Sequence, residues 1–265
     1  MANIGEILSI AKRANKIVMN YFGKIDYSLK RGEYYSKQLL TEADTKVEEF
    51  LFRSLAKKYP KYNFFGEEKG VIDKESEYTF LVDPISSTNN YIHKMPHFAV
   101  VVSLLKNDSP ILAVVLDSFY NELFHAVKGR GAYLNNNLIK VSSISDLKKS
   151  IITSCWSKKD GKSIAQGLYY SNKLSGIATT RRIGSLALQL AWIADGRMDA
   201  FLQNENDFFS LVAGSLIVKE AGGVVTDFGG EGYSKNSGSI VASNGRIHKE
   251  IMRCIKNPIS SGNDL

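Results

Sequence analysis

The sequence is poor in the residues that most transition-metal and redox sites use. Its 265 residues include only two cysteines and four histidines, and none of them stands at the spacing of a zinc or iron–sulfur site. Cys155 and Cys254 lie far apart in the sequence, so we expect two buried free thiols. No serine lies in the pattern of a nucleophile elbow, which disfavours Ser-His-Asp catalysis.

Long apolar runs are also absent. No segment approaches the roughly 18 consecutive apolar residues of a membrane-spanning helix, and the N-terminal residues MANIGE lack the basic flank and apolar stretch of a signal peptide. We therefore expect a cytoplasmic protein with no membrane partner. With 44% hydrophobic and 23% charged residues, the chain is apolar enough to fold as one large domain or two small ones.

Positive charge is in excess but is not concentrated. The 34 lysines and arginines outnumber the 27 acidic residues, which gives a net charge of +7 and would suit a polyanion or a phosphorylated small molecule. The densest groups, at residues 57–61 and 148–149, are short and have polar neighbours. This pattern favours a solvated surface over a nucleic-acid interface.

The hydrophobic pattern predicts an α/β protein with two unlike halves. Apolar residues at helical spacing predict a helix over residues 4–21, and a capping box at Thr41–Asp44 predicts a second helix that ends near Pro60. Short β-branched runs predict consecutive strands between residues 80 and 127. From residue 151 onward, strand-like and helix-like segments alternate. We therefore expect an α+β half over residues 1–147 and an α/β half over residues 148–265.

Three acidic sites lie at the ends of predicted elements. Asp44 is in a first helical turn, Glu67 and Glu68 follow an apolar run, and Asp83 ends a strand. Carboxylates in such places can project into a crevice and bind a hard cation such as Mg²⁺. Each also has an ordinary interpretation, respectively as a helix cap, a solvated loop and a strand terminator.

The surroundings of these acids resemble the signature of the inositol monophosphatase family. The resemblance rests on the segments FFGEE at 64–68 and VDPISSTNNY at 82–91, and it extends over nearly the whole chain. Further segments look like that family in its order and spacing: residues 40–44, 122–132, 182–185, 194–197 and 213–223.

The resemblance implies both a fold and a reaction. The fold is a layered α-β-α-β-α sandwich of the sugar phosphatase type, and members are usually homodimers that hydrolyse small phosphomonoesters by attack of a metal-bound water. Glu67, Asp83 and the carbonyl of Ile85 look like ligands of Mg²⁺ or Mn²⁺. Thr88 looks like the hydroxyl that, with Glu67, orients the water, and Asp44 looks like the hydrogen-bond partner of Thr88.

The same resemblance implies where a phosphorylated substrate binds. Backbone amides around Ser87 and Thr88, at a predicted helix start, would receive the phosphate. Ser86, Arg182 and Gln203 would contribute to the rest of the substrate site. Arg182 is equally compatible with a contact between the subunits of a dimer.

The sequence departs from the family at the second metal site. The family carries aspartates at the positions of Ser86 and Ser210, and a glutamate at the position of Gln203. A neutral hydroxyl is a poor substitute for a carboxylate, because it brings no charge to offset the dehydration of a divalent cation. We therefore expect one metal site rather than two or three.

Two interpretations remain open at this point. Glu205 and Asp207 lie just before Ser210 and are acidic where the family does not require acids, so either could replace a lost ligand. The first interpretation is a phosphomonoesterase acting on an inositol or sugar phosphate, with activity reduced by the replacements at Ser86 and Ser210. The alternative is a catalytically inactive family member that acts as a ligand-binding or regulatory protein.

Overall fold

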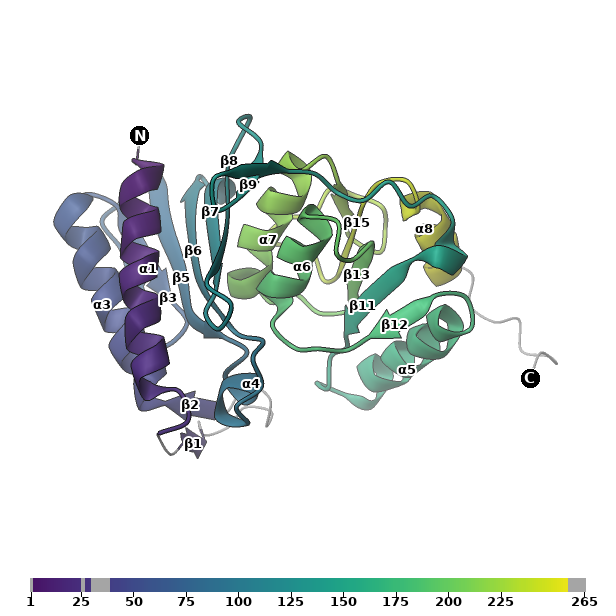
Figure 1. Ribbon diagram of the computed structural model, residues 1–265, viewed down its shortest axis with the longest axis horizontal. Coiled ribbons are helices and arrows are strands. Elements are labelled where there is room, and N and C mark those ends of the chain that lie inside the picture. Colours follow the sequence, from purple (N-terminus) through teal and green to yellow (C-terminus); the bar gives the residue numbers. More distant parts are fainter. Residues whose placement is uncertain (1, 25–26, 30–38, 257–265) are drawn as a thin grey trace.

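The computed structural model describes residues 2–24, 27–29 and 39–256, which form five alternating layers (Figure 1). An outer helix pair and an eight-stranded sheet are followed by an inner helix pair, a five-stranded sheet and a last helix pair. The helix pairs, in that order, are α1 (Ile4–Tyr21) with α3 (Glu42–Lys58), α6 (Leu186–Ala194) with α7 (Phe208–Glu220), and α5 (Gly161–Ser175) with α8 (His248–Lys256). The layered sandwich expected from the sequence is confirmed.

The larger sheet is antiparallel apart from one parallel pair, β3 with β5. Its strands, in spatial order, are β10 (Asn137–Ile139), β9 (Ala132–Leu134), β8 (Glu122–Val127), β7 (Ser109–Asp117), β6 (Ala99–Lys106), β5 (Tyr78–Ser86), β3 (Asn63–Gly66) and β4 (Gly70–Ile72). The smaller sheet has the order β12 (Thr179–Arg181), β11 (Ile151–Cys155), β13 (Ala200–Gln203), β15 (Ile240–Ser243) and β14 (Val224–Thr226). A separate two-stranded ladder pairs β1 (Tyr27–Leu29) with β2 (Leu39–Thr41).

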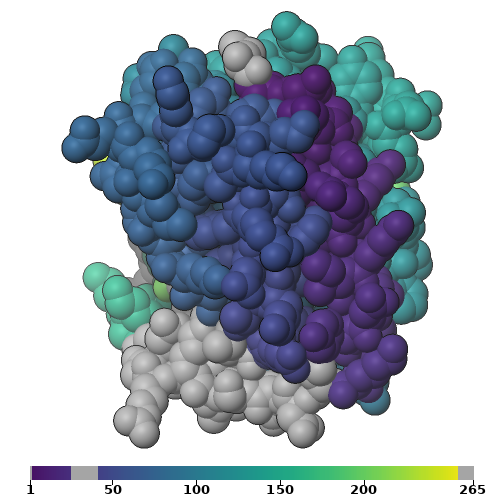
Figure 2. Space-filling model, turned by 90° about the vertical axis from the view of Figure 1, so that its left-hand side faces the viewer, coloured from purple at the N-terminus to yellow at the C-terminus, as the bar shows by residue number. Residues whose placement is uncertain are grey.

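Strand β6 shows why the sequences of the central strands are nearly continuous apolar runs, without alternation of apolar and polar residues. Successive side chains point to opposite faces of a sheet, and helices cover both faces here. Val100, Val102 and Leu104 pack into the core under α1 and α3, whereas Ala99 and Val101 pack into the core under α6 and α7. Figure 2 shows the outer face, where α1 (purple) and α3 (dark blue) lie side by side.

The helix starts follow the local sequence. In α3 the predicted capping box is present, because the Thr41 hydroxyl accepts a hydrogen bond from the Asp44 backbone N–H and the Asp44 carboxylate accepts one from the Thr41 N–H at 2.8 Å. The helix ends at Lys58, just before Pro60. In the described residues, no helix is long and apolar enough to cross a membrane.

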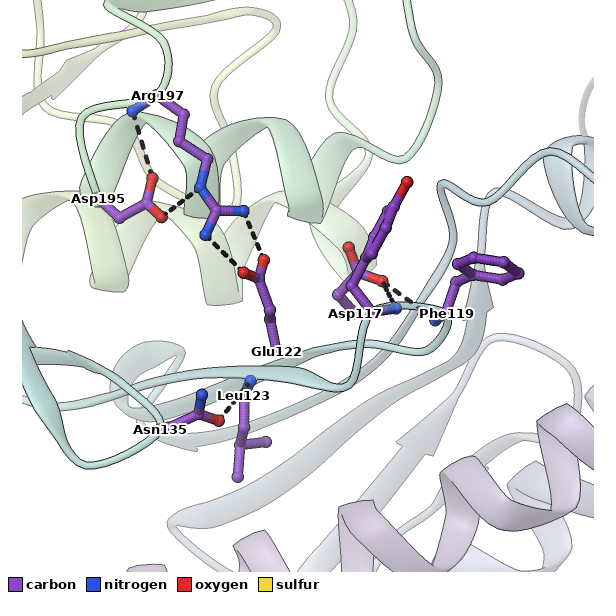
Figure 3. A network of polar contacts seen from close by, with 8 residues as sticks. Asp117, Phe119, Glu122, Leu123, Asn135, Asp195 and Arg197 are labelled. Atoms are coloured by element: carbon purple, nitrogen blue, oxygen red, sulfur yellow. Dashed lines mark hydrogen bonds and ion pairs between the residues drawn. The ribbon is translucent and has the colours of Figure 1, made fainter.

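The two halves share a core and an ion pair. The chain changes sheets between β10 and β11, but α6 and α7 pack against strands of both sheets. Arg197, in the loop after α6, donates two hydrogen bonds to Glu122 on β8, at 2.5 and 2.7 Å, and also pairs with Asp195 (Figure 3). The division into domains at residues 147 and 148 stays a prediction.

Candidate active site

A cavity of about 420 Å³ lies where the two halves meet. The segment from the end of β5 to the short helix α4 (Thr88–Ile92) lines one side, and the ends of β11 and β13 with the start of α7 line the other. Asp44 and Glu68 are not in the lining. The other residues that the sequence singled out for the site do line the cavity: Glu67, Asp83, Ile85, Ser86, Ser87, Thr88, Arg182, Gln203, Glu205, Asp207 and Ser210.

Parallel pairing of β3 with β5 brings the two acidic motifs together. Gly66 on β3 is in register with Val82 on β5, so the residues that follow, Glu67 and Asp83, emerge at the same edge of the sheet. The pairing of β5 with β6 shifts register between Asp83 and Ser86, and this irregular end of β5 contributes Asp83, Ile85 and Ser86 to the cavity wall.

Asp83 is the most deeply buried acid in the cavity wall, with 1% of its surface exposed. Burial raises the pKa of Asp83 to about 7; the hydrogen bond from Ser210 opposes this rise, and the neighbouring Asp207 carboxylate adds to it. The Ser210 hydroxyl donates to Asp83 Oδ2 at 2.8 Å. No described residue donates to the other oxygen, Oδ1, although it is buried.

Asp44 does not line the cavity but lies directly behind Thr88. The Thr88 hydroxyl is 3.1 Å from Asp44 Oδ1 and 3.2 Å from the carbonyl oxygen of Ile85, while Asp44 Oδ2 accepts from Thr41. Burial raises the pKa of Asp44 to about 6. Asp44 therefore caps its own helix and holds Thr88 at the same time, so both interpretations of this residue apply.

The loop that carries Arg182 is fastened to α4 by a close approach. The Asn90 side-chain amide donates to the carbonyl of Ile183 at 2.8 Å. Gly184 has φ +83°, and a Cβ there would lie 2.6 Å from that amide nitrogen and 2.9 Å from the Ser87 hydroxyl. Only glycine fits this position without moving the α4 segment. The expected helix start after Ser87 is confirmed, with Ser87 itself at φ +79°.

The opposite wall contains neighbours from two strands. Cys155 on β11 and Gln203 on β13 are paired in register. Gln203 is 4% exposed, and no described residue donates to its side-chain oxygen Oε1. Both cysteines are free, as expected, but neither is fully buried. The expectation of buried thiols was wrong, because Cys155 is at a strand end that opens into the cavity.

The oxygen atoms on the β5 side are of the kind that a hard cation binds. The carboxyl groups of Glu67 and Asp83 interact with each other, Asp83 Oδ1 is buried without a donor, and the Ile85 carbonyl is part of the same wall. Carboxylate and carbonyl oxygens are the ligands that Mg²⁺ and Mn²⁺ prefer. Within the described ranges, no group of three or more acidic, histidine or cysteine side chains is placed to hold a metal.

Comparison with known proteins decides the family. The model of the inositol monophosphatase family matches residues 4–259. The chain belongs to the inositol monophosphatase family. Members are phosphatases that use Mg²⁺ and bind small phosphorylated substrates.

Individual family members of several kinds match almost the entire chain. An inositol-1-monophosphatase of Mesorhizobium japonicum is 31% identical, with 98% of each chain covered. The Nus factor SuhB of Escherichia coli is 32% identical, with 98% of this chain and 97% of SuhB covered. The structure of the extragenic suppressor protein SuhB from Bartonella henselae matches with a TM-score of 0.90 at 30% identity. The match includes 97% of this chain and 99% of the SuhB chain.

The structure also shows a site residue that the sequence analysis missed. Glu48 on α3 is fully buried, and its Oε1 accepts a hydrogen bond from the backbone N–H of Glu68 at 2.8 Å. The available signal was its spacing, since Glu48 is four positions after Asp44 and therefore lies on the same helix face.

Proposed function

We propose that this chain is a Mg²⁺-dependent phosphomonoesterase that acts on an inositol or sugar phosphate, with turnover reduced by the loss of the second metal site. The observation that carries the proposal is the position of the Thr88 hydroxyl, which contacts Asp44 Oδ1 and the Ile85 carbonyl beside two acidic side chains. This is a suitable arrangement for orienting a water molecule toward a phosphate.

In the proposed mechanism, Glu67, Asp83 and the Ile85 carbonyl would hold one Mg²⁺ or Mn²⁺. The cation would acidify water and offset the charge of the phosphate. Because Thr88 gives its hydroxyl proton to Asp44, its lone pairs are left to accept a proton of the attacking water, and Glu67 is a second acceptor for that water. Asp44 keeps the Thr88 hydroxyl in this orientation.

Substrate binding is assigned to the walls on either side. Arg182 is the proposed partner of the phosphate or of a second anionic group, together with Ser86, Ser87 and the amides near Thr88. Gln203 is the proposed partner of a substrate hydroxyl, because its buried Oε1 has no donor among the described residues.

The reduced turnover follows from Ser86 and Ser210. Both side chains are neutral and buried, so neither supplies charge to a second cation. The Ser210 hydroxyl also donates to Asp83 Oδ2, which occupies an oxygen that a second cation would need. Glu205 and Asp207 line the cavity but do not complete a group of three ligands in the described residues, and we propose a single metal site.

The same hydrogen bond favours the alternative function, a non-catalytic protein that binds a phosphorylated ligand or acts in regulation. Several relatives of comparable identity are named Nus factor SuhB, so names of two kinds occur among the relatives. We further propose a homodimer located in the cytoplasm.

The deciding experiment measures phosphate release from inositol phosphates, fructose 1,6-bisphosphate and nucleotide 3′-phosphates over a range of Mg²⁺ and Mn²⁺ concentrations. Asp83→Asn is the blank and excludes a contaminating phosphatase. Metal-dependent release that disappears in the blank supports the enzyme. Release no greater than the blank on every substrate rejects it in favour of the binding protein.

A further inference from the structure

The Glu67–Glu68 turn is held from below by a buried carboxylate. Glu48 is fully buried on α3. Its Oε1 accepts a hydrogen bond from the backbone N–H of Glu68 at 2.8 Å. Burial raises the pKa of Glu48, and the backbone N–H groups of Glu68 and Lys69 both oppose this rise. Its other oxygen has no donor in the described part of the chain. A buried carboxylate with an unsatisfied oxygen costs stability, so core packing does not explain a glutamate at this position.

The hydrogen bond acts on the peptide group that joins Glu67 to Glu68. The N–H of Glu68 belongs to the same rigid plane as the carbonyl of Glu67. Fixing this plane restricts the ψ angle of Glu67 and hence the direction of its side chain.

Gly66 makes this approach geometrically possible. A Cβ at Gly66 would lie 2.2 Å from Glu48 Oε1 and 2.6 Å from its carboxyl carbon. Real Cβ atoms do not come so close, so a side chain at position 66 would displace the Glu48 carboxylate. Gly66 therefore leaves the space that the Glu48 carboxylate needs to reach the Glu68 N–H.

One face of α3 supports both halves of the site. Asp44 and Glu48 are one helical turn apart; Asp44 holds the Thr88 hydroxyl and Glu48 holds the Glu67–Glu68 turn. We propose that Glu48 is a positioning residue, which sets the orientation of Glu67 for metal binding without touching the metal or the substrate. This proposal rests on the metal site of the proposed function.

The test compares two variants of equal length, Glu48→Gln and Glu48→Met. Both remove the charge and keep the buried volume, but only glutamine retains a strong acceptor for the Glu68 N–H. We expect the Kd for Mn²⁺, measured from the electron paramagnetic resonance signal of free Mn²⁺, to rise about tenfold in Glu48→Met. In Glu48→Gln we expect a rise of no more than about threefold. Gly66→Ala should weaken Mn²⁺ binding as Glu48→Met does, although it leaves the carboxylate in place.

Two controls separate positioning from general damage. Val47→Ala removes buried methyl groups from the adjacent core position and should lower the melting temperature without changing the Kd. Glu49→Gln removes a neighbouring exposed charge that pairs with Lys69 at 3.6 Å and should leave both quantities unchanged.

The outcomes distinguish this proposal from the proposed function. If the unaltered protein binds Mn²⁺ and Glu48→Met binds it equally well, the positioning role is wrong and the metal site stands. The positioning role is also wrong if Glu48→Gln is impaired as much as Glu48→Met, or if Val47→Ala raises the Kd to the same extent. If the unaltered protein binds no Mn²⁺, the metal site and the positioning role are both wrong.

Discussion

Replacing Ser210 by aspartate is expected to make the stability of the protein depend more strongly on metal than the stability of the unaltered protein does. The Ser210 hydroxyl is 2.8 Å from Asp83 Oδ2, and both residues are buried. In Ser210→Asp, a second carboxylate takes the place of this hydroxyl. Without a cation the two carboxylates repel each other, and with a cation they become joint ligands.

The magnitude follows from this separation. Two unit charges roughly 4 Å apart repel by about 4 kcal/mol at an effective dielectric constant of 20, and uptake of a shared proton relieves part of this. We therefore expect a loss of about 2 kcal/mol of unfolding free energy in EDTA, equivalent to a fall of about 4–8 °C in melting temperature. A cation at a hundred times its Kd returns about 2.7 kcal/mol.

The assay is thermal unfolding at pH 8 in EDTA and in a Mg²⁺ series, with Ser210→Asn as a neutral control of similar size. Phosphate release is measured in parallel for Ser210→Asp and for the double variant with Ser86→Asp. If a second cation stabilises the leaving group by about 2.7 kcal/mol, turnover of the double variant rises about a hundredfold.

One result would refute the reasoning. If Ser210→Asp is destabilised equally in EDTA and in Mg²⁺, and Ser210→Asn behaves in the same way, an aspartate at position 210 does not complete a second metal site with Asp83. A metal-dependent gain in stability with no gain in turnover has a different meaning: the metal site is restored and the substrate walls have diverged.

Three further predictions address the rest of the molecule. Thr88→Val should lower kcat about a hundredfold with little change in Mn²⁺ affinity, and Thr88→Ser should retain most of the activity; equal losses in both would contradict the role of the hydroxyl. Arg197→Ala should lower the melting temperature more than Glu122→Gln does. The arginine variant also leaves the Asp195 carboxylate, whose side chain is 6% exposed, without its cation. Equal falls in melting temperature would contradict this reasoning. Burial raises the pKa of Asp117 from its ordinary value of 3.8 to about 6. The folded protein therefore loses stability as the pH rises from about 4 to about 6, and the loss stays constant at higher pH. Asp117→Asn should therefore be more stable than the unaltered protein at pH 8 by about 2 to 3 kcal/mol, with no difference below pH 4, as measured by urea unfolding at the two pH values.

Local pattern was sufficient for most of the secondary structure. The helix at residues 4–21, the capping box at Thr41 and the consecutive strands up to residue 127 were confirmed, because capping and β-branched runs act over a few residues. The short strand β12 and the last helix α8 were not predicted. β12 has only three residues and an exposed alternate face, so packing next to β11 decides its conformation.

The sequence by itself indicated most of the residues that line the candidate cavity, because the motifs at residues 64–68 and 82–91 are local. Its resemblance to the family indicated that serines stand at 86 and 210 where acids are expected. The sequence did not determine how these residues meet. The register of β3 with β5 places Glu67 beside Asp83, and the Ser210 hydroxyl reaches Asp83 from a helix 127 positions away.

Glu48 illustrates the same division. In the sequence it is one acid among several on an amphipathic helix, where a solvated position is the usual outcome. Only the packing of α3 against the end of β3, over the bare Cα of Gly66, buries this carboxylate and directs it to the Glu68 N–H. The sequence specifies which chemical groups are available. Their distances and burial depend on contacts between residues that are far apart in the sequence, and these contacts form only in the folded protein.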